Sequence, residues 1–280
     1  YLIVQMIGIV CAQGVVALGD PSGFILFIIP SVLVSVAFAP ILLSVNPTPA
    51  FDTTKAMTLK ELYRVSPLGC VGIFLLGGVF GVQFGMGAVF ATESGLSINR
   101  ISSFIATIYI GALLLQYPIG WISDRMDRRR LIFFVAAIGA ASGIVGILFG
   151  ASYPVLLAVA FVMGGMSNPL YSLLLAYTND FLELDDMAAA SGGLIFINGM
   201  GAILGPVITG WMMATFGPSG FWMVISLLMF ALAGYAAYRM TQRPSIDVGE
   251  TGAYVGFTQS TTALSVEAAQ EWAAEQHDDA

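Results

Sequence analysis

The chain has 280 residues, of which 58% are hydrophobic and 10% are charged, and its formal net charge is −7. Its mean hydropathy is +0.87. A soluble helical domain needs charged side chains on most of its helices, so this composition excludes a soluble helical domain. The acidic balance also gives no reason to expect a nucleic-acid partner.

Eight stretches of the chain contain no Asp, Glu, Lys, Arg or His. In chain order they are residues 1–18, 22–44, 67–91, 101–122, 131–150, 154–179, 187–213 and 219–238. Most reach the ~20 apolar residues that a helix needs to cross a bilayer core. The sequence therefore predicts an all-α fold, a polytopic transmembrane bundle with eight spans. The first span lacks the basic start and cleavage site of a signal peptide, and we interpret the chain as the C-terminal part of a longer one.

The connections between the spans differ sharply in basic residues. Nine of the ten lie in residues 45–66, 123–130, 180–186 and from 239 onward, and the tenth is Arg100. Basic connections face the cytoplasm, so we expect the C-terminus on the cytoplasmic side of the membrane. The four acids after the sixth span, which are Asp180, Glu183, Asp185 and Asp186, are expected to form an acidic connection on the cytoplasmic side.

Two turns of the chain share the same four-residue sequence. Pro21-Ser22-Gly23-Phe24 joins the first two spans, and Pro218-Ser219-Gly220-Phe221 joins the last two, 197 residues later. Pro-Ser-Gly is also a common turn sequence, so coincidence is the alternative. With the matching topology, the repetition favours a six-span repeat, and a six-plus-six protein would have four further spans before residue 1.

Amide side chains occur in the first, third, fourth, sixth and seventh spans and are missing from the second, fifth and eighth. They are Gln5, Gln13, Gln83, Gln116, Asn168, Asn179 and Asn198. A buried amide is costly in lipid, so the sorting predicts five helices around a polar cavity and three that face lipid. For any single amide, a hydrogen bond between helices is the better explanation, and for the sorted set a polar central cavity is. With the nearby tyrosines, the substrate-cavity candidates are Gln5, Gln83, Tyr109, Gln116, Asn168, Tyr171 and Asn198.

Proline and glycine mark two places where helices could bend or slide. Pro169 lies near the middle of the sixth span, where it removes a helical hydrogen bond. The seventh span contains Gly201, Gly205 and Pro206, with the four-residue spacing of closely packed helices. Both features predict a kink or a gate, and packing alone is the alternative reading.

The connection between the fourth and fifth spans reads Gly120-Trp-Ile-Ser-Asp124-Arg125-Met-Asp127-Arg128-Arg129-Arg130. It resembles the signature loop of the major facilitator superfamily, Gly-x-x-x-Asp-Arg/Lys-x-Gly-Arg-x-Arg/Lys. The sequence departs from this pattern at Asp127, where the signature has glycine. An Asp at a helix end can pair with a base and hold helix ends together. We therefore predict a conformational latch of Gly120, Asp124, Arg125 and Arg128.

The resemblance extends over residues 1 to about 240, and Gln116-Tyr117-Pro118 before the loop is similar to the bacterial YcaD-like group. It implies helices five to twelve of a twelve-helix permease in a bacterial inner membrane. The implied domains are 1–44 (the last two helices of the N-terminal half), 45–66 (central linker), 67–240 (C-terminal half) and 241–280 (acidic, disordered tail).

The implied function is secondary active transport of a small organic solute by a monomer, in contact with lipid and without a cofactor. A coupling proton stays open, because a carboxylate to carry it would lie in the missing helices. The two unclustered cysteines, Cys11 and Cys70, and the single His277 predict neither a metal site nor an enzyme. A non-transporting sensor or scaffold on the same fold is the alternative.

Overall fold

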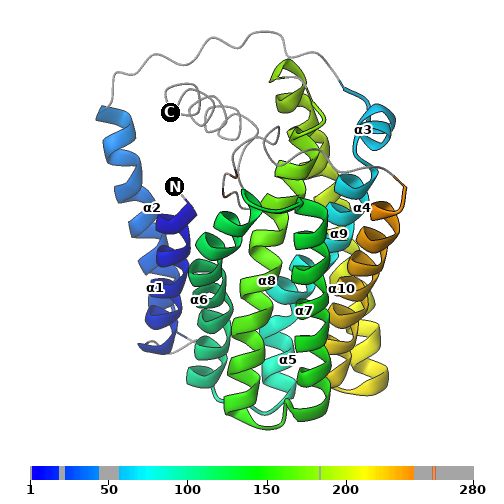
Figure 1. The fold of residues 1–280 in the computed structure, drawn as a ribbon. Helices are drawn as coiled ribbons and strands as arrows, with labels where there is room; N and C mark the ends of the chain where they lie inside the picture. Colours follow the sequence, from blue (N-terminus) through cyan, green and yellow to red (C-terminus); the bar gives the residue numbers. More distant parts are fainter. Residues whose placement is uncertain are drawn as a thin grey trace.

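The computed structural model describes residues 2–18, 23–43, 57–182 and 184–242, together with Tyr254 and Gly256 (Figure 1). All regular structure in these ranges is helical. In chain order the helices are α1 (Leu2–Leu18), α2 (Ile25–Leu43), α3 (Leu59–Val65), α4 (Pro67–Phe80), η1 (Gly81–Met86), α5 (Gly87–Glu93), α6 (Ile98–Ser123), α7 (Arg128–Phe149), α8 (Tyr153–Asn179), α9 (Leu184–Phe216) and α10 (Ser219–Met240).

The predicted spans are confirmed as helices. Six of the eight are long and apolar enough to cross a membrane. The third of the eight predicted spans, residues 67–91, is built from α4, η1 and α5 in succession. The apolar parts of α1 and α2, Val4–Val16 and Ile25–Ala39, are shorter. The all-α transmembrane bundle predicted from hydropathy is therefore correct.

The helices pack in pairs. α6 packs most extensively on α8, α7 on α10, and α4 on α9, while α1 lies against α6. Figure 1 shows α1 and α2 on one side of the bundle and α10 on the opposite side. The short connections α6–α7 and α8–α9 lie at the same end of the bundle as the start of α3 and the end of α10. We call this the basic end, because seven of the eight basic residues that the structure describes lie here, all except Arg100.

Glycines allow the close approach of these pairs. A Cβ atom on Gly201 of α9 would overlap the carbonyl oxygen of Phe74 on α4, and one on Gly164 of α8 would overlap that of Ile108 on α6. Gly205 lies equally close to the backbone of Gly78. Small residues thus bring the backbones into contact, as expected for helices packing in a membrane.

The span formed by α4, η1 and α5 is interrupted at its centre by the π-helix η1. Its first residue, Gly81, lies against α9, where an added Cβ would be 2.9 Å from Cδ of Pro206. Gly85 lies against the same proline ring. By contrast, α8 continues through Pro169 as one helix of 27 residues. The irregular backbone therefore lies in α4–α5 and not at the proline that predicted it, and π-turns of this kind are frequent at functional sites.

The end opposite the basic end is closed by an aromatic core. Phe90 of α5 stacks on Phe221 of α10 at 4.6 Å between ring centroids, and Trp222 meets both Phe90 and Phe104 edge-on. All four rings are buried. This core fixes α5, α6 and α10 to one another and leaves the polar side chains to the middle and the basic end.

Candidate functional site

The loop between α6 and α7 turns without the glycine of the family signature. Asp127 has φ −54° and ψ 113°, and its carboxylate accepts a hydrogen bond of 2.9 Å from the backbone N–H of Arg129, so it caps the N-terminus of α7. The guanidinium of Arg129 also pairs with this carboxylate at 2.9 Å. The negative φ explains why a side chain is tolerated here, and Asp is a favoured cap.

The charge of this cap is stabilised locally. Burial alone would raise the pKa of the Asp127 carboxyl, but the hydrogen bonds and positive charge of Arg129 outweigh it and hold that pKa below its ordinary value. The cap therefore stays ionised at neutral pH and complements the start of α7.

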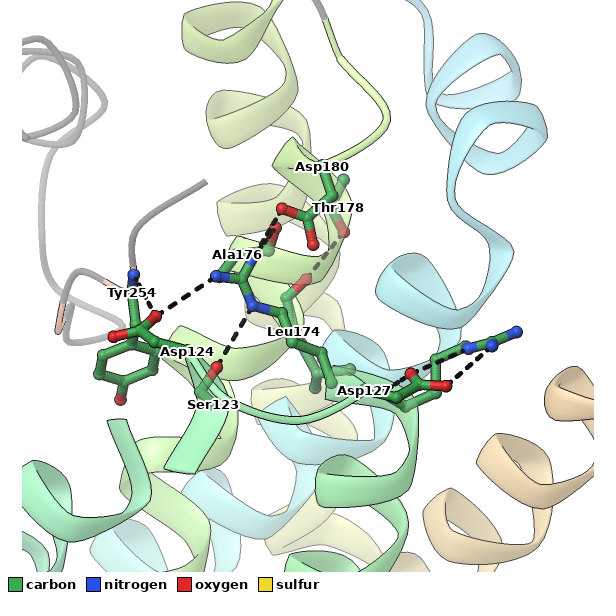
Figure 2. Close-up of polar contacts among 10 residues, drawn as sticks. Ser123, Asp124, Asp127, Leu174, Ala176, Thr178, Asp180 and Tyr254 are labelled. Atoms are coloured by element: carbon green, nitrogen blue, oxygen red, sulfur yellow. Dashed lines mark hydrogen bonds and ion pairs between the residues drawn. The ribbon is translucent and has the colours of Figure 1, made fainter. Parts of the chain in front are cut away.

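Arg128 joins three helices at the basic end (Figure 2). It is 3% exposed, and its guanidinium forms a hydrogen-bonded ion pair with Asp180 at the end of α8. The same guanidinium donates to the carbonyl of Ala176 at 3.4 Å and to Oγ of Ser123 at 3.2 Å. Asp124 lies farther away, 3.7 Å from the second terminal nitrogen. The Asp180 side chain is 4% exposed, so this acid of the predicted acidic connection is buried against Arg128.

Arg125 takes no part in this network. It is exposed, lies 4.1 Å above the ring of Trp121, and donates to the carbonyl of the same residue at 3.0 Å. Among the predicted latch residues, the structure therefore brings together Asp124 and Arg128, while Arg125 packs along its own helix.

A residue from beyond α10 completes the basic end. The backbone N–H of Tyr254 donates to Oδ1 of Asp124 at 2.9 Å, and its hydroxyl accepts from Nε2 of Gln116 at 2.6 Å. The ring covers Gly120, where an added Cβ would be 2.6 Å from Cδ1 of the tyrosine. Burial, the main cause, and the neighbouring Asp124 carboxylate both raise the pKa of the Tyr254 phenol. It therefore stays protonated at neutral pH.

The amides of the middle of the bundle make contacts between helices. Gln83 of η1 is 2% exposed and accepts a hydrogen bond of 3.1 Å from Ser167 of α8, while its Nε2 has no partner among the described residues. Asn198 of α9 is buried and donates to the carbonyl of Ile73 at 3.4 Å. Asn168 is half-buried and donates to the carbonyl of Gly164 on its own helix at 3.1 Å.

Aromatic side chains form a row that includes Phe84, the residue that follows Gln83 in η1. Phe84 stacks on Tyr109 of α6 at 5.3 Å and on Phe80 of α4 at 5.7 Å, and Phe80 meets Tyr171 of α8 at 6.3 Å. Tyr171 is buried and Tyr109 is half-buried. The structure thus brings together two predicted tyrosines with two phenylalanines that sequence reasoning missed, because nothing in their spacing distinguishes them from core residues.

The remaining candidates lie apart from this row. Gln116 is two turns farther along α6 toward the basic end, where it donates to Ser172 at 3.3 Å as well as to Tyr254. Gln5 is half-buried on α1. In the described ranges, no group of three or more His, Cys, Asp or Glu side chains is placed to hold a metal ion.

The comparisons with known proteins agree with this architecture. The family model of the Major Facilitator Superfamily matches residues 68–259, so the chain belongs to this superfamily of membrane transporters and is a multi-pass membrane protein. The predicted resemblance is confirmed.

Two bacterial relatives illustrate the match. The chain is 26% identical over 190 residues to the uncharacterized MFS-type transporter YfkF of Bacillus subtilis (strain 168), which covers 65% of this chain and 47% of the relative. It is 24% identical over 182 residues to the uncharacterized MFS-type transporter YcaD of Escherichia coli (strain 55989 / EAEC), covering 64% and 46%. The chain therefore spans about half the length of the curated relatives it matches.

Proposed function

We propose that the complete protein is a secondary transporter that moves a small organic solute across a bacterial inner membrane by alternating access between two six-helix halves. Residues 67–240 form the C-terminal half, 1–44 supply the last two helices of the other half, and 45–66 link them. The basic end, with the tail 241–280, faces the cytoplasm, and the protein acts as a monomer. Membership of the superfamily supports this proposal.

The arrangement of the helices supports a passage on one side of the C-terminal half. α7 and α10, which contain no amide, pack on each other on the side away from α1 and α2 (Figure 1). α2, the third helix without an amide, exposes nearly all of its described side chains. α6 and α9 are the least buried of the six long helices, with 28% and 33% of the residues in their apolar segments buried. Such helices are suited to face a second half across a cavity, while α2, α7 and α10 form a lipid-facing wall.

The observation that carries the proposal is the buried amide nitrogen of Gln83, which has no partner among the described residues. Gln83 lies in η1 next to Phe84, whose ring belongs to the aromatic row with Tyr109, Phe80 and Tyr171. A buried donor without a partner is costly, and a bound solute with an acceptor oxygen would satisfy it. The aromatic faces would hold an apolar body. These groups carry no charge, which favours a neutral or weakly charged solute. Asn168, Asn198, Gln116 and Gln5 are proposed as further cavity residues.

The test of this site compares two tyrosines of one helix. We expect Tyr109→Leu to weaken solute binding about tenfold or more, the loss of ~1.4 kcal/mol or more of aromatic and hydroxyl contact. Tyr117, eight residues farther along α6, is 79% exposed, and Tyr117→Leu should change binding less than about twofold. A panel of neutral organic solutes is first screened by thermal stabilisation of the complete protein in detergent, and those that stabilise it are then assayed for flux into liposomes.

Either of two results would contradict the assignment. Equal losses in the two variants would remove Tyr109 from the site. Solutes that bind but never cross the liposome membrane would argue for the sensor or scaffold and against a transporter.

The signature loop is proposed to act as a latch. Asp124 belongs to the basic end, where it lies 3.7 Å from Arg128. We expect Asp124→Ala to slow transport about tenfold, because an ionic contact made in only one of two conformations shifts their populations by that amount. Solute affinity should stay within about twofold, since Asp124 is distant from the aromatic row. Initial flux rates and equilibrium binding of the same variant decide this, and a parallel loss of both would refute the latch.

A further inference from the structure

Tyr254 lies against the helix bundle at the basic end (Figure 2). Three contacts hold it: the hydrogen bond of its N–H to Asp124, the hydrogen bond of its hydroxyl with Gln116, and the ring on Gly120. Gly256 also lies against α6, where an added Cβ would be 3.0 Å from Nε2 of Gln116. The backbone, the side chain and the next described residue therefore all dock on α6.

The docking stripe of α6 is the one that faces α1. Ala112, Gln116 and Gly120 are spaced by four residues and so share one face of the helix. Ala112 is fully buried and packs against Met6 of α1. Tyr254 therefore continues, toward the basic end, the strip of α6 that α1 covers. In the proposed organisation α1 belongs to the other half, which places this tyrosine between the halves.

The contacts made by Tyr254 can be exchanged for water. Asp124 is 41% exposed and keeps Arg128 within 3.7 Å when the tyrosine leaves. Gln116 keeps its hydrogen bond to Ser172, and its amide oxygen has no partner among the described residues even with Tyr254 in place. A contact of two hydrogen bonds and one ring is suited to reversible docking, because neither partner is left buried with an unpaired charge.

We propose that Tyr254 and Gly256 form an autoinhibitory strap, which closes the basic-end mouth between the two halves by docking on Gln116, Gly120 and Asp124. These two residues must leave before a solute passes at this end. The strap rests on the proposed two-half transporter, and it commits to one occupant for this face of α6, the chain's own Tyr254 and Gly256.

The first experiment measures docking without any solute. Ser172 is fully buried next to Gln116. Ser172→Cys supplies a single reporter thiol in a background where Cys11, Cys70 and every further cysteine of the complete protein are replaced by alanine. In the complete protein, a charged maleimide should label this thiol about tenfold faster when Tyr254→Ala is added, because the labelling rate follows the population of the undocked state. Tyr254→Phe, which keeps the ring, should give an intermediate rate.

The control for this experiment is a tyrosine at the same end. Tyr238 of α10 is 55% exposed, and Tyr238→Ala should leave the labelling rate unchanged. Equal labelling with and without Tyr254→Ala would overturn the strap.

The second experiment traps the docked state and does not depend on the Ser172 variant. Gln116→Cys and Gly256→Cys in the same background place two thiols together, since a Cβ at 256 would lie 3.8 Å from Cγ of Gln116. Mild oxidation should form the intramolecular disulfide and reduce the flux of a solute identified as above about tenfold relative to the same double variant in its reduced form, and reduction should restore the flux of that reduced variant. Failure of the disulfide to form, with both single-cysteine controls accessible, would show that the strap does not dock.

Flux separates the strap from the proposed function. Tyr254→Ala leaves Asp124 and the aromatic row intact and should raise the flux rate. A disulfide that forms without changing flux would refute the strap and leave the transporter standing. Flux absent from every variant, with labelling and disulfide formation as expected, would refute the transporter and leave the docking standing.

Discussion

Arg128→Ala is expected to lower the free energy of unfolding by about 3–5 kcal/mol, because it leaves the carboxylate of Asp180 buried without its ionic partner. Both side chains are nearly inaccessible, and the guanidinium also holds Ser123 of α6 and the end of α8. Chemical unfolding of the complete protein in mixed micelles measures this loss.

Two matched variants make the result specific. Arg130→Ala removes an exposed base two residues away and should change stability by less than about 0.5 kcal/mol. The double variant Arg128→Met with Asp180→Leu removes both charges and should recover most of the lost stability, since an apolar pair of similar volume tolerates burial. If Arg128→Ala were as stable as Arg130→Ala, the buried pair would not hold these helices together.

Gly201→Ala and Gly199→Ala are expected to change stability in opposite directions. The added methyl group at 201 would overlap the carbonyl oxygen of Phe74, so α9 and α4 must separate at a cost of about 1–3 kcal/mol. At 199 the methyl group meets nothing within 4 Å, and alanine should stabilise the helix by roughly 0.5–1 kcal/mol.

Thermal unfolding of the two glycine variants in one detergent checks this prediction. Equal effects would mean that α4 and α9 are not in backbone contact. The gating role predicted for Gly201, Gly205 and Pro206 stays a prediction, and flux measured on Gly205→Ala, which meets the backbone of Gly78, addresses it separately.

The helical spans could be predicted closely because each depends on its own composition. The apolar stretch 131–150 became α7 at Arg128–Phe149, and 219–238 became α10 at Ser219–Met240. Helix starts also follow local chemistry. Asp127 caps α7, and Thr58 and Glu61 form a capping box at the start of α3. The family signature identified the loop between α6 and α7 as a structural junction.

The candidate site was less predictable. Seven tyrosine and amide candidates were selected by residue type and depth, and the structure joins Tyr109 and Tyr171 in one aromatic row but ties Gln116 to the basic end. Phe80 and Phe84 were missed because, within an apolar span, the sequence does not distinguish a phenylalanine that lines a site from one that packs in the core. Asp180 was missed because four acids follow the sixth span and only packing shows which of them Arg128 reaches.

The sequence alone determined that this is a multi-pass helical membrane protein of the major facilitator superfamily, since the hydrophobic length of each span and the signature loop are local properties of the chain. Only the tertiary structure decided where the helix is irregular, which acid neutralises Arg128, and that Tyr254 lies on Gly120. Each of these depends on residues far apart in the chain. Gly81 meets Pro206, Arg128 meets Asp180, and the energy of such contacts depends on geometry that residue types do not specify.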